Sequence, residues 1–397
     1  MKNYLFLEKQ VLLPLYPQRG LVLVRGQGVH LYDINNKEYL DMMSNYGVNI
    51  FGHTNQFILN AISYQLKKIT NLHGSFTSSM RVEAADRLIK MCKLPEYQIY
   101  FSNSGTEAME AALKFAVLTT GKKKFIVMKN NYHGKTLGAL STMVGSKYQK
   151  PFLPLLWDMV ETEFGDIKDL TKKISSEFAA VVLEPIQGEG GIHVPSGDYL
   201  RDVQRLCQSC NVLMIVDEIQ TGAGRTGEFL CSSYSRIEPD IIALGKGIGG
   251  GLPVGVTLVS RQVSQKIIRG IHSSTFGGNP LTCAGICASL EYMIENDIFS
   301  HVKKIGDYFI NQLMSIKSPH IKQVRGKGLM IGVELDQPVT PVLKFMQDNG
   351  ILVIPGGDMV VRFLPPYIIE KKHVDKTINV FNKALKSLIV TSNIKSA

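Results

Sequence analysis

Lys246 stands between an apolar run and a cluster of glycines. The run 241–244 precedes it, and glycines occupy positions 245, 247 and 249–251. At the buried end of a strand a free ammonium is costly, whereas covalent attachment of an aldehyde cofactor removes that cost and gives the lysine a chemical purpose. Taken alone, the pattern is also typical of a solvated lysine at a strand end, so a second residue is needed to decide.

Asp217 is that second residue. It ends the apolar run 212–216, and a carboxylate in such a position suits the ring nitrogen of pyridoxal phosphate, whose protonated ring is the electron sink of the cofactor's chemistry. An isolated aspartate here would usually be a helix cap or a turn residue. Together, the lysine and the aspartate predict a site for pyridoxal phosphate.

A helix start with room for a phosphate is the third feature. Ser104 and Glu107 have the spacing of a capping box. The free N–H groups of Gly105 and Thr106, with the helix dipole behind them, would suit a phosphate monoester. A well-capped helix without a ligand is the alternative for this motif by itself, and its combination with the lysine and the aspartate favours the phosphate.

The elements that must position these residues alternate between strand-like and helix-like segments. The strand-like runs cover 99–101, 124–128, 179–184, 212–217, 241–244 and 254–260. Such alternation predicts an α/β domain with a mainly parallel sheet and helices on both faces. Ligands bind beyond the carboxyl ends of the strands in such sheets. One site can therefore gather the residues that end or follow these runs, namely Ser104, Tyr132, Glu189, Asp217 and Lys246.

The remaining segments predict a smaller α+β domain. A long connecting helix at 281–296 is followed by helices at 302–316, 342–349 and 371–388 and by strands within 321–334 and 360–363. With 397 residues the chain exceeds the size at which a single core stops growing. We therefore predict a segment 1–45 that packs with the small domain, a large cofactor-binding domain 46–289, and the small domain 290–397.

The composition is that of a globular chain without a metal site. Apolar residues make up 45% and charged residues 20%, and there are six cysteines. So few cysteines form no disulfide framework and fit a reducing compartment, so we expect a cytoplasmic protein. Cys207 and Cys210 have the spacing of a metal or redox pair, but no second pair accompanies them and the segment is predicted to be helical.

The formal net charge of +10 leaves several partners open. It would suit a nucleic acid, an acidic protein or an acidic substrate, or reflect a lysine-rich proteome. Nothing in the sequence resembles a nucleic-acid-binding module, and no apolar run approaches the ~20 residues that span a membrane. We expect neither a nucleic-acid nor a membrane partner.

Eight short motifs lie in order along nearly the whole chain. They are Asn103–Ala108, Tyr132–Thr136, Glu184–Gly191, Asp217–Gly222, Gly224–Gly227, Leu244–Gly247, Ser274–Pro280 and Arg362–Pro366. In this order they resemble the class III (subgroup II) aminotransferases of the acetylornithine and ornithine type. The resemblance implies the fold type I of pyridoxal-phosphate-dependent transferases, with a seven-stranded, mainly parallel sheet in the large domain.

The resemblance also implies a role for each residue around the cofactor ring. Lys246 would hold the cofactor and then move a proton between the substrate carbon and the cofactor. Asp217 would pair with the ring nitrogen, and Gln220 would hydrogen-bond near the ring hydroxyl. Tyr132 would stack on one face of the ring, and Ile219 would cover the other.

The phosphate of the cofactor would be held from two subunits in such a family. Ser104, Gly105 and Thr106 would bind it at the start of the helix. Thr275 would reach the same phosphate from a neighbouring subunit. We therefore expect a homodimer with shared active sites.

Substrate-binding residues implied by the resemblance are Lys135, Glu189, Ser274 and Arg362. The arginine would bind the α-carboxylate of glutamate or 2-oxoglutarate with its planar fork, and Glu189 would pair with it when the other substrate is bound. Lys135 departs from the family, because acetylornithine-type enzymes usually have an arginine there. A lysine keeps the charge but loses the fork, so it would contact a carboxylate as a point charge and not bidentately.

The implied reaction moves the δ- or ε-amino group of an α-blocked ornithine or lysine to 2-oxoglutarate, giving a semialdehyde and glutamate in arginine or lysine biosynthesis. The block would be an acetyl group or an acidic amino-group carrier protein; stretches such as 147–155 and 316–321 resemble the carrier-dependent enzymes, and a basic surface would attract an acidic carrier. Alternatives are 4-aminobutyrate or free-ornithine transamination, an intramolecular 2,1-aminomutase, and an inactive scaffold or regulator.

Overall fold

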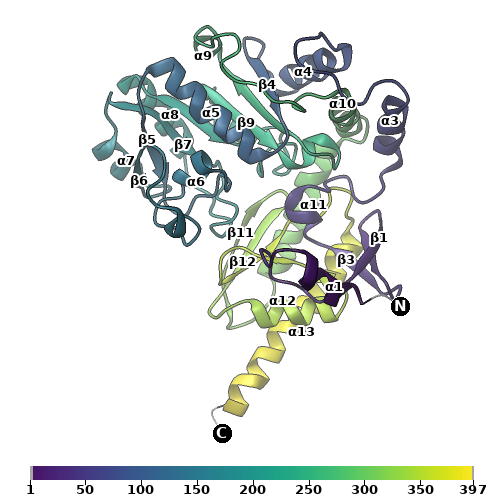
Figure 1. Cartoon of the computed structure of the whole chain (residues 1–397). Helices are drawn as coiled ribbons and strands as arrows, with labels where there is room; N and C mark the ends of the chain where they lie inside the picture. The colour runs from purple at the N-terminus through teal and green to yellow at the C-terminus, as the bar shows by residue number, and fades with distance from the viewer. Residues whose placement is uncertain (1–2, 396–397) are drawn as a thin grey trace.

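A seven-stranded sheet with the order β4-β10-β9-β8-β7-β5-β6 forms the centre of the fold (Figure 1). Its strands are β4 (Gln98–Ser102), β5 (Lys124–Met128), β6 (Asp158–Thr162), β7 (Phe178–Leu183), β8 (Leu213–Asp217), β9 (Ile241–Gly245) and β10 (Gly255–Val259). Strands β6, β5, β7, β8 and β9 are parallel, whereas β10 is antiparallel to both β9 and β4. The predicted α/β fold with a mainly parallel sheet is therefore confirmed.

The computed structural model describes residues 3–395, so the outermost residues of both predicted terminal segments lie outside it. Six of the seven strands lie where the sequence predicts them. The sequence does not predict β6, which is an edge strand paired with β5 alone. Its acidic residues Asp158 and Glu161 interrupt the apolar pattern, which an edge strand tolerates because one side of its backbone has no neighbour.

Helices cover both faces of this sheet. Val127 and Val182 belong to the core cluster that includes α5 (Gly105–Thr120), whereas Ile126 and Val181 belong to the cluster that includes α8 (Tyr199–Cys210). Successive residues of a strand point to opposite faces, so neighbours in sequence enter different clusters. The other helices of this part are α3 (Gln56–Leu66), α4 (Ser79–Cys92), α6 (Leu137–Ser141), α7 (Ile167–Lys173), α9 (Arg261–Ser264) and α10 (Pro280–Glu295).

The start and end of α5 follow from its sequence. Ser104 Oγ accepts a hydrogen bond from the N–H of Glu107, and the Glu107 carboxylate accepts one from the N–H of Asn103. The helix ends at Gly121, whose φ of +70° favours glycine. The serine half of the expected capping box is therefore present, whereas the glutamate binds the N–H of Asn103 in place of that of Ser104. The amino end of α5 lies beyond the carboxyl end of the strands.

A second part of the chain carries two four-stranded sheets. One contains β11 (Ile321–Lys327), β12 (Met330–Leu335), β15 (Val360–Phe363) and β14 (Ile354–Pro355); the other contains β1 (Leu23–Gln27), β2 (His30–Asp33), β3 (Glu38–Asp41) and β13 (Ile351–Leu352). Its helices are α1 (Tyr4–Val11), α11 (Ile298–Met314), α12 (Thr340–Asp348) and α13 (Lys371–Lys395). In the second sheet β3 pairs in parallel with β13, Leu40 opposite Ile351. The division into domains at residues 45 and 289 stays a prediction.

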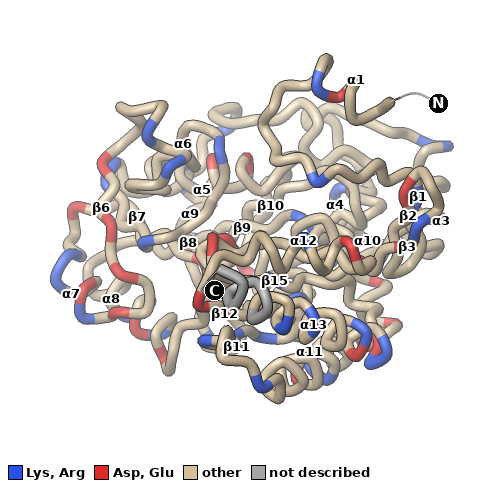
Figure 2. The backbone as a smooth tube through the Cα atoms, turned by 90° about the horizontal axis from the view of Figure 1, so that it is seen from below, with Lys and Arg blue, Asp and Glu red and all other residues tan. Residues whose placement is uncertain are grey.

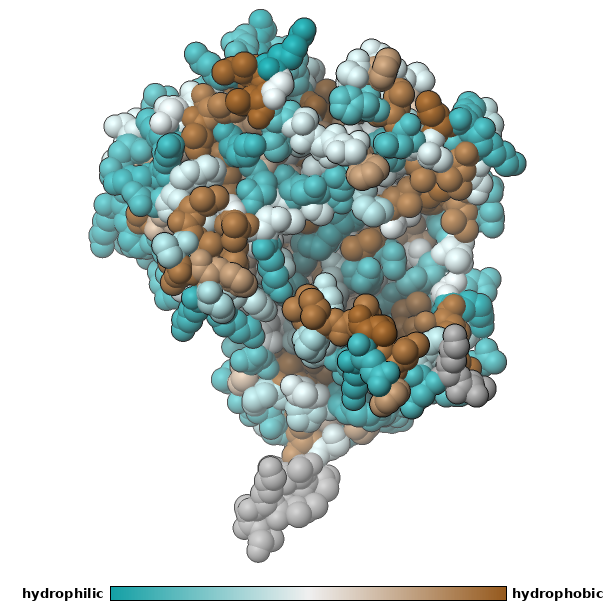
Figure 3. Space-filling view, in the orientation of Figure 1, coloured by the Kyte–Doolittle hydropathy of each residue, from teal (hydrophilic) through white to brown (hydrophobic). Residues whose placement is uncertain are grey.

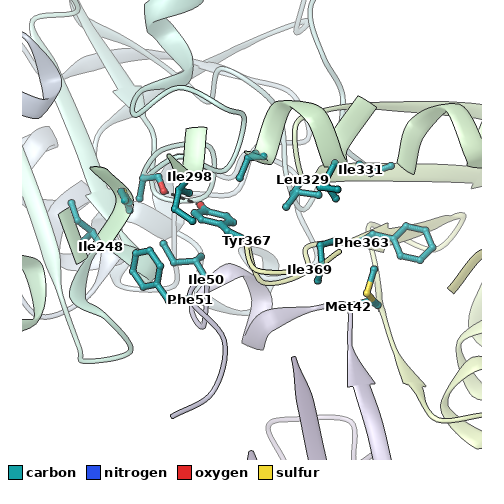
Figure 4. Close-up of a cluster of buried hydrophobic side chains, with 14 of the residues drawn as sticks. Met42, Ile50, Phe51, Ile248, Ile298, Leu329, Ile331, Phe363, Tyr367 and Ile369 are labelled. Atoms are coloured by element: carbon teal, nitrogen blue, oxygen red, sulfur yellow. Dashed lines mark hydrogen bonds between the residues drawn. The ribbon is translucent and has the colours of Figure 1, made fainter. Parts of the chain in front are cut away.

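One continuous core joins the two parts. Figure 4 shows side chains from the amino-terminal region, from the glycine-rich turn after β9 and from the sheet that contains β12 and β15 packed together. They include Met42, Ile50, Phe51, Ile248, Ile298, Leu329, Ile331, Phe363, Tyr367 and Ile369. The hydroxyl of Tyr367 donates to the carbonyl of Ala223 over 2.9 Å. This core and the hydrogen bond of Tyr367 hold the second part of the chain against the end of the large sheet.

Within residues 3–395, no helix combines the length and the apolar character needed to cross a membrane. The same residues contain no cluster of three or more histidine, cysteine, aspartate or glutamate side chains arranged to hold a metal ion. The six cysteines are all free thiols.

We predict that Phe309→Ala lowers the free energy of unfolding by about 3–5 kcal/mol, because it removes a fully buried ring and leaves a cavity. Phe309 lies in α11, and its ring centroid is 5.0 Å from that of Phe363, next to Arg362. Chemical denaturation measures the loss. Met314→Ala, at a position of the same helix with 65% exposure, is the control and should change stability by less than about 0.5 kcal/mol. Equal losses in both variants would contradict the packing role of Phe309.

Candidate active site

Asp217 and Lys246 lie at the carboxyl ends of two neighbouring strands of the large sheet. Asp217 ends β8, Lys246 directly follows β9, and the two strands are parallel neighbours. Lys246 has a φ of +50°, a left-handed conformation that costs energy in a residue with a Cβ. A Cβ at Gly247 would lie 2.5 Å from the side chain of Ile50, so the packing requires a glycine directly after the lysine. The backbone here is held in a strained form by close packing.

Asp217 is buried and has two partners. Its Oδ2 lies 2.7 Å from Nδ1 of His133, and its Oδ1 accepts a 2.9 Å hydrogen bond from the N–H of Ile219. Burial alone would lower the pKa of His133, but the hydrogen bond and the charge of Asp217 outweigh it and raise that pKa. Nε2 of His133 is buried without a hydrogen-bond partner among the described residues. The carboxylate is thus oriented from one side, with an imidazole fixed behind it.

A second buried carboxylate, Glu184, lies just beyond the end of β7. It accepts hydrogen bonds of 3.0 Å from the N–H groups of Tyr132 and Gly188. Burial raises the pKa of Glu184 to about 7, partly opposed by the charge of His133. Glu184 therefore ties the loop that carries Tyr132 to the loop that carries Glu189.

Lys246 is half-buried among charged groups. Burial lowers the pKa of its ammonium, although the charges of Asp217 and Glu189 act in the opposite direction. A lowered pKa increases the fraction of neutral amine, which is the form that attacks a carbonyl carbon. The site therefore favours the reactive form of the lysine.

Arg362 lies in β15 and is fully buried. Its Nη2 donates to Oε1 of Glu189 over 2.7 Å, and its Nη1 donates to Oε1 of Gln220 over 3.2 Å. Its Nε has no hydrogen-bond partner among the described residues, and its guanidinium carbon lies 5.6 Å from the ring centroid of Tyr46. The side chain of Glu189 is 33% exposed. A guanidinium is thus held by a carboxylate that borders solvent.

The start of α5 is packed closely against the same site. A Cβ at Gly105 would lie 2.8 Å from the side chain of Ile219, so a larger residue would displace Ile219. Oγ1 of Thr106 and Oγ1 of Thr136 are 2.8 Å apart. These contacts place the free amino end of the helix beside the buried aspartate.

Three residues predicted from the resemblance lie outside this buried group. Lys135 is exposed, and its Nζ lies 4.4 Å from the ring centroid of Tyr148. Ser274 Oγ accepts hydrogen bonds from Nδ2 of Asn103 and the N–H of Gly277, each of 3.0 Å. Thr275 is exposed on the loop before α10. Their roles stay predictions.

Sequence reasoning assigned no role to four further residues that shape the site: Tyr46, His133, Glu184 and Arg225. His133 follows Tyr132, and Glu184 ends a strand-like run. The sequence therefore indicates that they lie near the site, but it does not predict that they are buried. Tyr46 lies in a turn, Ser44–Gly47, whose four φ angles are all positive. Three of these four residues are not glycine, so the sequence gives no indication of a left-handed turn here.

The donor set fits pyridoxal phosphate. A buried carboxylate at a strand end suits its ring nitrogen, a lysine of lowered pKa one strand away suits its aldehyde, and a capped helix start with a required glycine suits its phosphate.

We predict that Glu184→Gln makes the stability of the cofactor-free protein less dependent on pH. The raised pKa means that the native protein holds a proton that the unfolded chain releases, so this contribution to stability is fully present below the ordinary value of 4.5. It is lost as the pH rises through about 7, by up to about 3 kcal/mol.

Urea titrations at about pH 5.5 and 8 measure this dependence. The wild type should lose more stability at the higher pH than Glu184→Gln does. Exposed Glu295→Gln is the control and should behave like the wild type. The same pH dependence in all three proteins would show that Glu184 is charged in the native state.

Comparisons with known proteins agree on the family. The family model described as aminotransferase class-III matches residues 16–385. The acetylornithine aminotransferase of Methanosarcina mazei is 39% identical over 370 residues, which is 93% of each chain. The LysW-aminoadipate semialdehyde/glutamate semialdehyde transaminase of Sulfolobus acidocaldarius is 38% identical over 376 residues, 94% of this chain and 97% of the relative.

A solved structure shares the whole fold. The crystal structure of the ornithine aminotransferase from Toxoplasma gondii has a TM-score of 0.94 and 30% identity, covering 98% of this chain and 95% of that one. A second structure of that enzyme has pyridoxal phosphate at partial occupancy in its active site. The fold-type prediction is therefore confirmed. The chain belongs to the class-III aminotransferases, the pyridoxal-phosphate-dependent transaminases that its motifs and its fold both indicate.

Proposed function

We propose that the enzyme transfers the δ- or ε-amino group of an α-blocked ornithine or lysine to 2-oxoglutarate, giving a semialdehyde and glutamate in arginine or lysine biosynthesis. Support comes from the relatives, which are named for acetylornithine and for LysW-linked semialdehydes. Both kinds of substrate have a blocked α-amine, so the terminal amine is the one left to react.

The observation that carries this proposal is the ion pair between Glu189 and Arg362 beside Lys246. With Glu189 in place, the guanidinium is neutralised and the site accepts an amine without an adjacent free carboxylate. When 2-oxoglutarate binds, its α-carboxylate takes the fork of Arg362, because bidentate pairing is the stronger arrangement. Glu189 can then turn towards solvent, which its side chain already borders.

Each residue around the cofactor acts on a stated atom in this proposal. Bound pyridoxal phosphate would supply an electron sink for the substrate carbon that loses a proton. Lys246 would hold the cofactor through Nζ and carry that proton between its two positions. Asp217 would accept a hydrogen bond from the ring nitrogen, kept in place by His133. Gln220 would bond near the ring hydroxyl.

The faces of the ring and its phosphate would be held by neighbouring segments. Tyr132 and Ile219 would cover the two faces. The phosphate would be bound at the start of α5 by the hydroxyl of Ser104 and the N–H groups of Gly105 and Thr106.

We also propose a homodimer in which Thr275 of the partner subunit completes the phosphate site. The loop that carries this threonine, between α9 and α10, exposes Phe276 by 58% and Ile268 by 63%. Phe76, also 63% exposed, lies on the loop before α4, and Arg81 donates to the carbonyls of both Phe76 and Gly278. Exposed large apolar side chains of this kind mark protein–protein contacts when they gather on one surface.

Lys135 and Ser274 complete the proposed substrate-binding residues. The ammonium of Lys135 lies 4.4 Å from the ring centroid of Tyr148, which meets the ring of Tyr132 edge-on. We propose that the blocked end of a long substrate arrives there. A single point charge there tolerates different blocking groups better than a guanidinium fork would. Ser274 lies beside Asn103 at the start of α5. The second candidate function is free-ornithine transamination, favoured by the structural similarity to an ornithine aminotransferase.

A cytoplasmic location is proposed on the basis of the thiols. All six cysteines are free, and five are buried. Unpaired cysteines fit a reducing compartment.

We predict that Lys246→Ala abolishes both the absorbance of the lysine-bound cofactor and turnover. Loss of the base should reduce kcat by at least about 10²–10⁴-fold. Spectra and steady-state rates of the cofactor-loaded protein measure the two effects. Exposed Lys317→Ala is the control and should keep both. A variant at position 246 that retains turnover would refute the assignment.

The substrate is tested by adding amines one at a time to the cofactor-loaded enzyme without 2-oxoglutarate. Acetylornithine or a carrier-linked lysine should convert the cofactor absorbance to that of its amine form, while 4-aminobutyrate stays inert. Conversion by 4-aminobutyrate or free ornithine alone would overturn the biosynthetic proposal. Turnover of an amine to an isomer without any 2-oxoglutarate would indicate a mutase instead.

A further inference from the structure

One stretch of the chain, which includes residues beside the site, contains no acidic residue. Residues 111–157 contain eight lysines and no aspartate or glutamate. At the average of 34 acidic residues in 397, a stretch of 47 residues would contain about four. The net charge of the whole chain, +10, is therefore concentrated here, and in Figure 2 basic segments of the tube appear near α6.

Two lysines of the stretch are neutralised by acidic residues outside it. Lys124 pairs with Glu177 over 2.7 Å, and Lys129 pairs with Glu163 over 2.7 Å. Among the side chains that the structure describes, Lys135, Lys147 and Lys150 have no carboxylate oxygen within 4.0 Å. These three ammonium groups are exposed, so their charge faces solvent.

The free lysines surround exposed apolar side chains. Nζ of Lys135 lies 4.4 Å and Nζ of Lys147 lies 5.5 Å from the ring centroid of Tyr148, which is 39% exposed. Phe152 and Leu153, which follow Lys150, are each 58% exposed. We call this surface the lysine face, made of Lys135, Lys147, Tyr148, Lys150, Phe152 and Leu153. Figure 3 shows apolar side chains gathered at the surface in the region of α6, beside hydrophilic ones.

The lysine face borders the active site. The ring of Tyr148 meets that of Tyr132 edge-on, with 6.4 Å between the centroids. The N–H of Tyr132 donates to Glu184, and burial, with a smaller contribution from the charge of Glu189, raises the pKa of the Tyr132 phenol. A molecule on the lysine face is therefore one aromatic ring away from the substrate-switch pair.

We propose that the lysine face is the docking surface of an acidic protein that carries the amine substrate, joined to it by an amide bond through the α-amine. This inference rests on the proposed function, and it selects the protein-linked substrate over the acetylated one. Lys147 and Lys150 are exposed whereas Arg362 is fully buried, so a small acetylated amine held at the buried groups would leave these surface charges unused. An apolar centre with a charged rim is the usual composition of a protein–protein interface.

Electrostatics explains why the surface lacks acidic residues. Lysines at the rim accelerate the encounter with an acidic partner, and a carboxylate among them would repel it. Tyr148, whose ring has two ammonium groups near it, would supply the apolar contact at the centre once the partner excludes water. The amine at the end of its side chain would then extend past Tyr132 to Lys246.

The test compares two substrates of the holoenzyme. One is acetylornithine, and the other is ornithine joined through its α-amine to a carboxyl group of a small acidic protein. In the variant Lys147→Glu with Lys150→Glu, KM for the conjugate should rise about 10-fold or more, while kcat/KM for acetylornithine should stay within about twofold. For the wild type alone, KM for the conjugate should rise as ionic strength increases from about 0.05 to 0.3 M.

The matched control is Lys123→Glu with Lys172→Glu. Both lysines are exposed, Lys123 just before the amino end of β5 and Lys172 near the end of α7, which leads to the amino end of β7. They therefore lie at the end of the strands away from the site, and the change in net charge is the same. This control should use the conjugate like the wild type. An equal rise in KM in both double variants would show a general charge effect and overturn the docking surface.

Two other results would also overturn it. If the wild type uses the conjugate and the Lys147/Lys150 variant uses it equally well, the docking surface is wrong and the proposed function stands. If the wild type uses acetylornithine but not the conjugate, the carrier is wrong and aminotransfer from a blocked amine stands. Failure on both substrates would remove the proposed function itself. Tighter binding of a DNA duplex than of the conjugate would assign the surface to nucleic acid.

Discussion

Two carboxylates buried at the ends of neighbouring strands constrain everything around them. Asp217 ends β8 and Glu184 follows β7, and a buried carboxylate is stable only where donors reach it. The donors come from elsewhere in the chain: His133 for Asp217, and the N–H groups of Tyr132 and Gly188 for Glu184. The loop after β5 must therefore cross to β7 and β8. The position of Tyr132 over the site is a result of satisfying these two acids.

Two buried arginines connect the site to the smaller part of the molecule. Arg362 reaches from β15 to Glu189 and Gln220. Arg225 donates to the carbonyls of Leu329 and Pro365 at 3.0 and 2.6 Å and to Oγ of Ser44 at 3.3 Å. The second arginine thus holds the left-handed turn that presents Tyr46. A displacement of the smaller part would change the substrate end of the site while leaving Asp217 and Lys246 in place.

Local patterns made much of this arrangement predictable. One apolar run ends in Asp217 and another precedes Lys246, and both predict strands. The serine and the glutamate at the start of α5 predict a capped helix. What depends on distant contacts was not predictable. The edge strand β6 has a weak apolar pattern, and the pairing of His133 with Asp217 joins residues 84 positions apart. The resemblance predicts Lys135 as a substrate-binding residue, but its position against the ring of Tyr148 at the surface depends on the fold. The proposed role of Thr275 comes from the resemblance alone, because it requires a partner subunit.

The parallel pairing of β3 with β13 imposes an order on biosynthesis. Leu40 hydrogen-bonds across to a partner segment around Ile351, 311 positions further along the chain. A ribosome that adds 5–20 residues per second needs roughly 15–60 s to cover that interval. During this time β3 has β2 on one side but nothing on the other, and the side chains of Leu40 and Met42, fully buried in the finished enzyme, lack the carboxyl-terminal part of their core. The first part of the protein to emerge is thus among the last to become folded, and the nascent chain depends on protection from aggregation until its carboxyl-terminal strands appear.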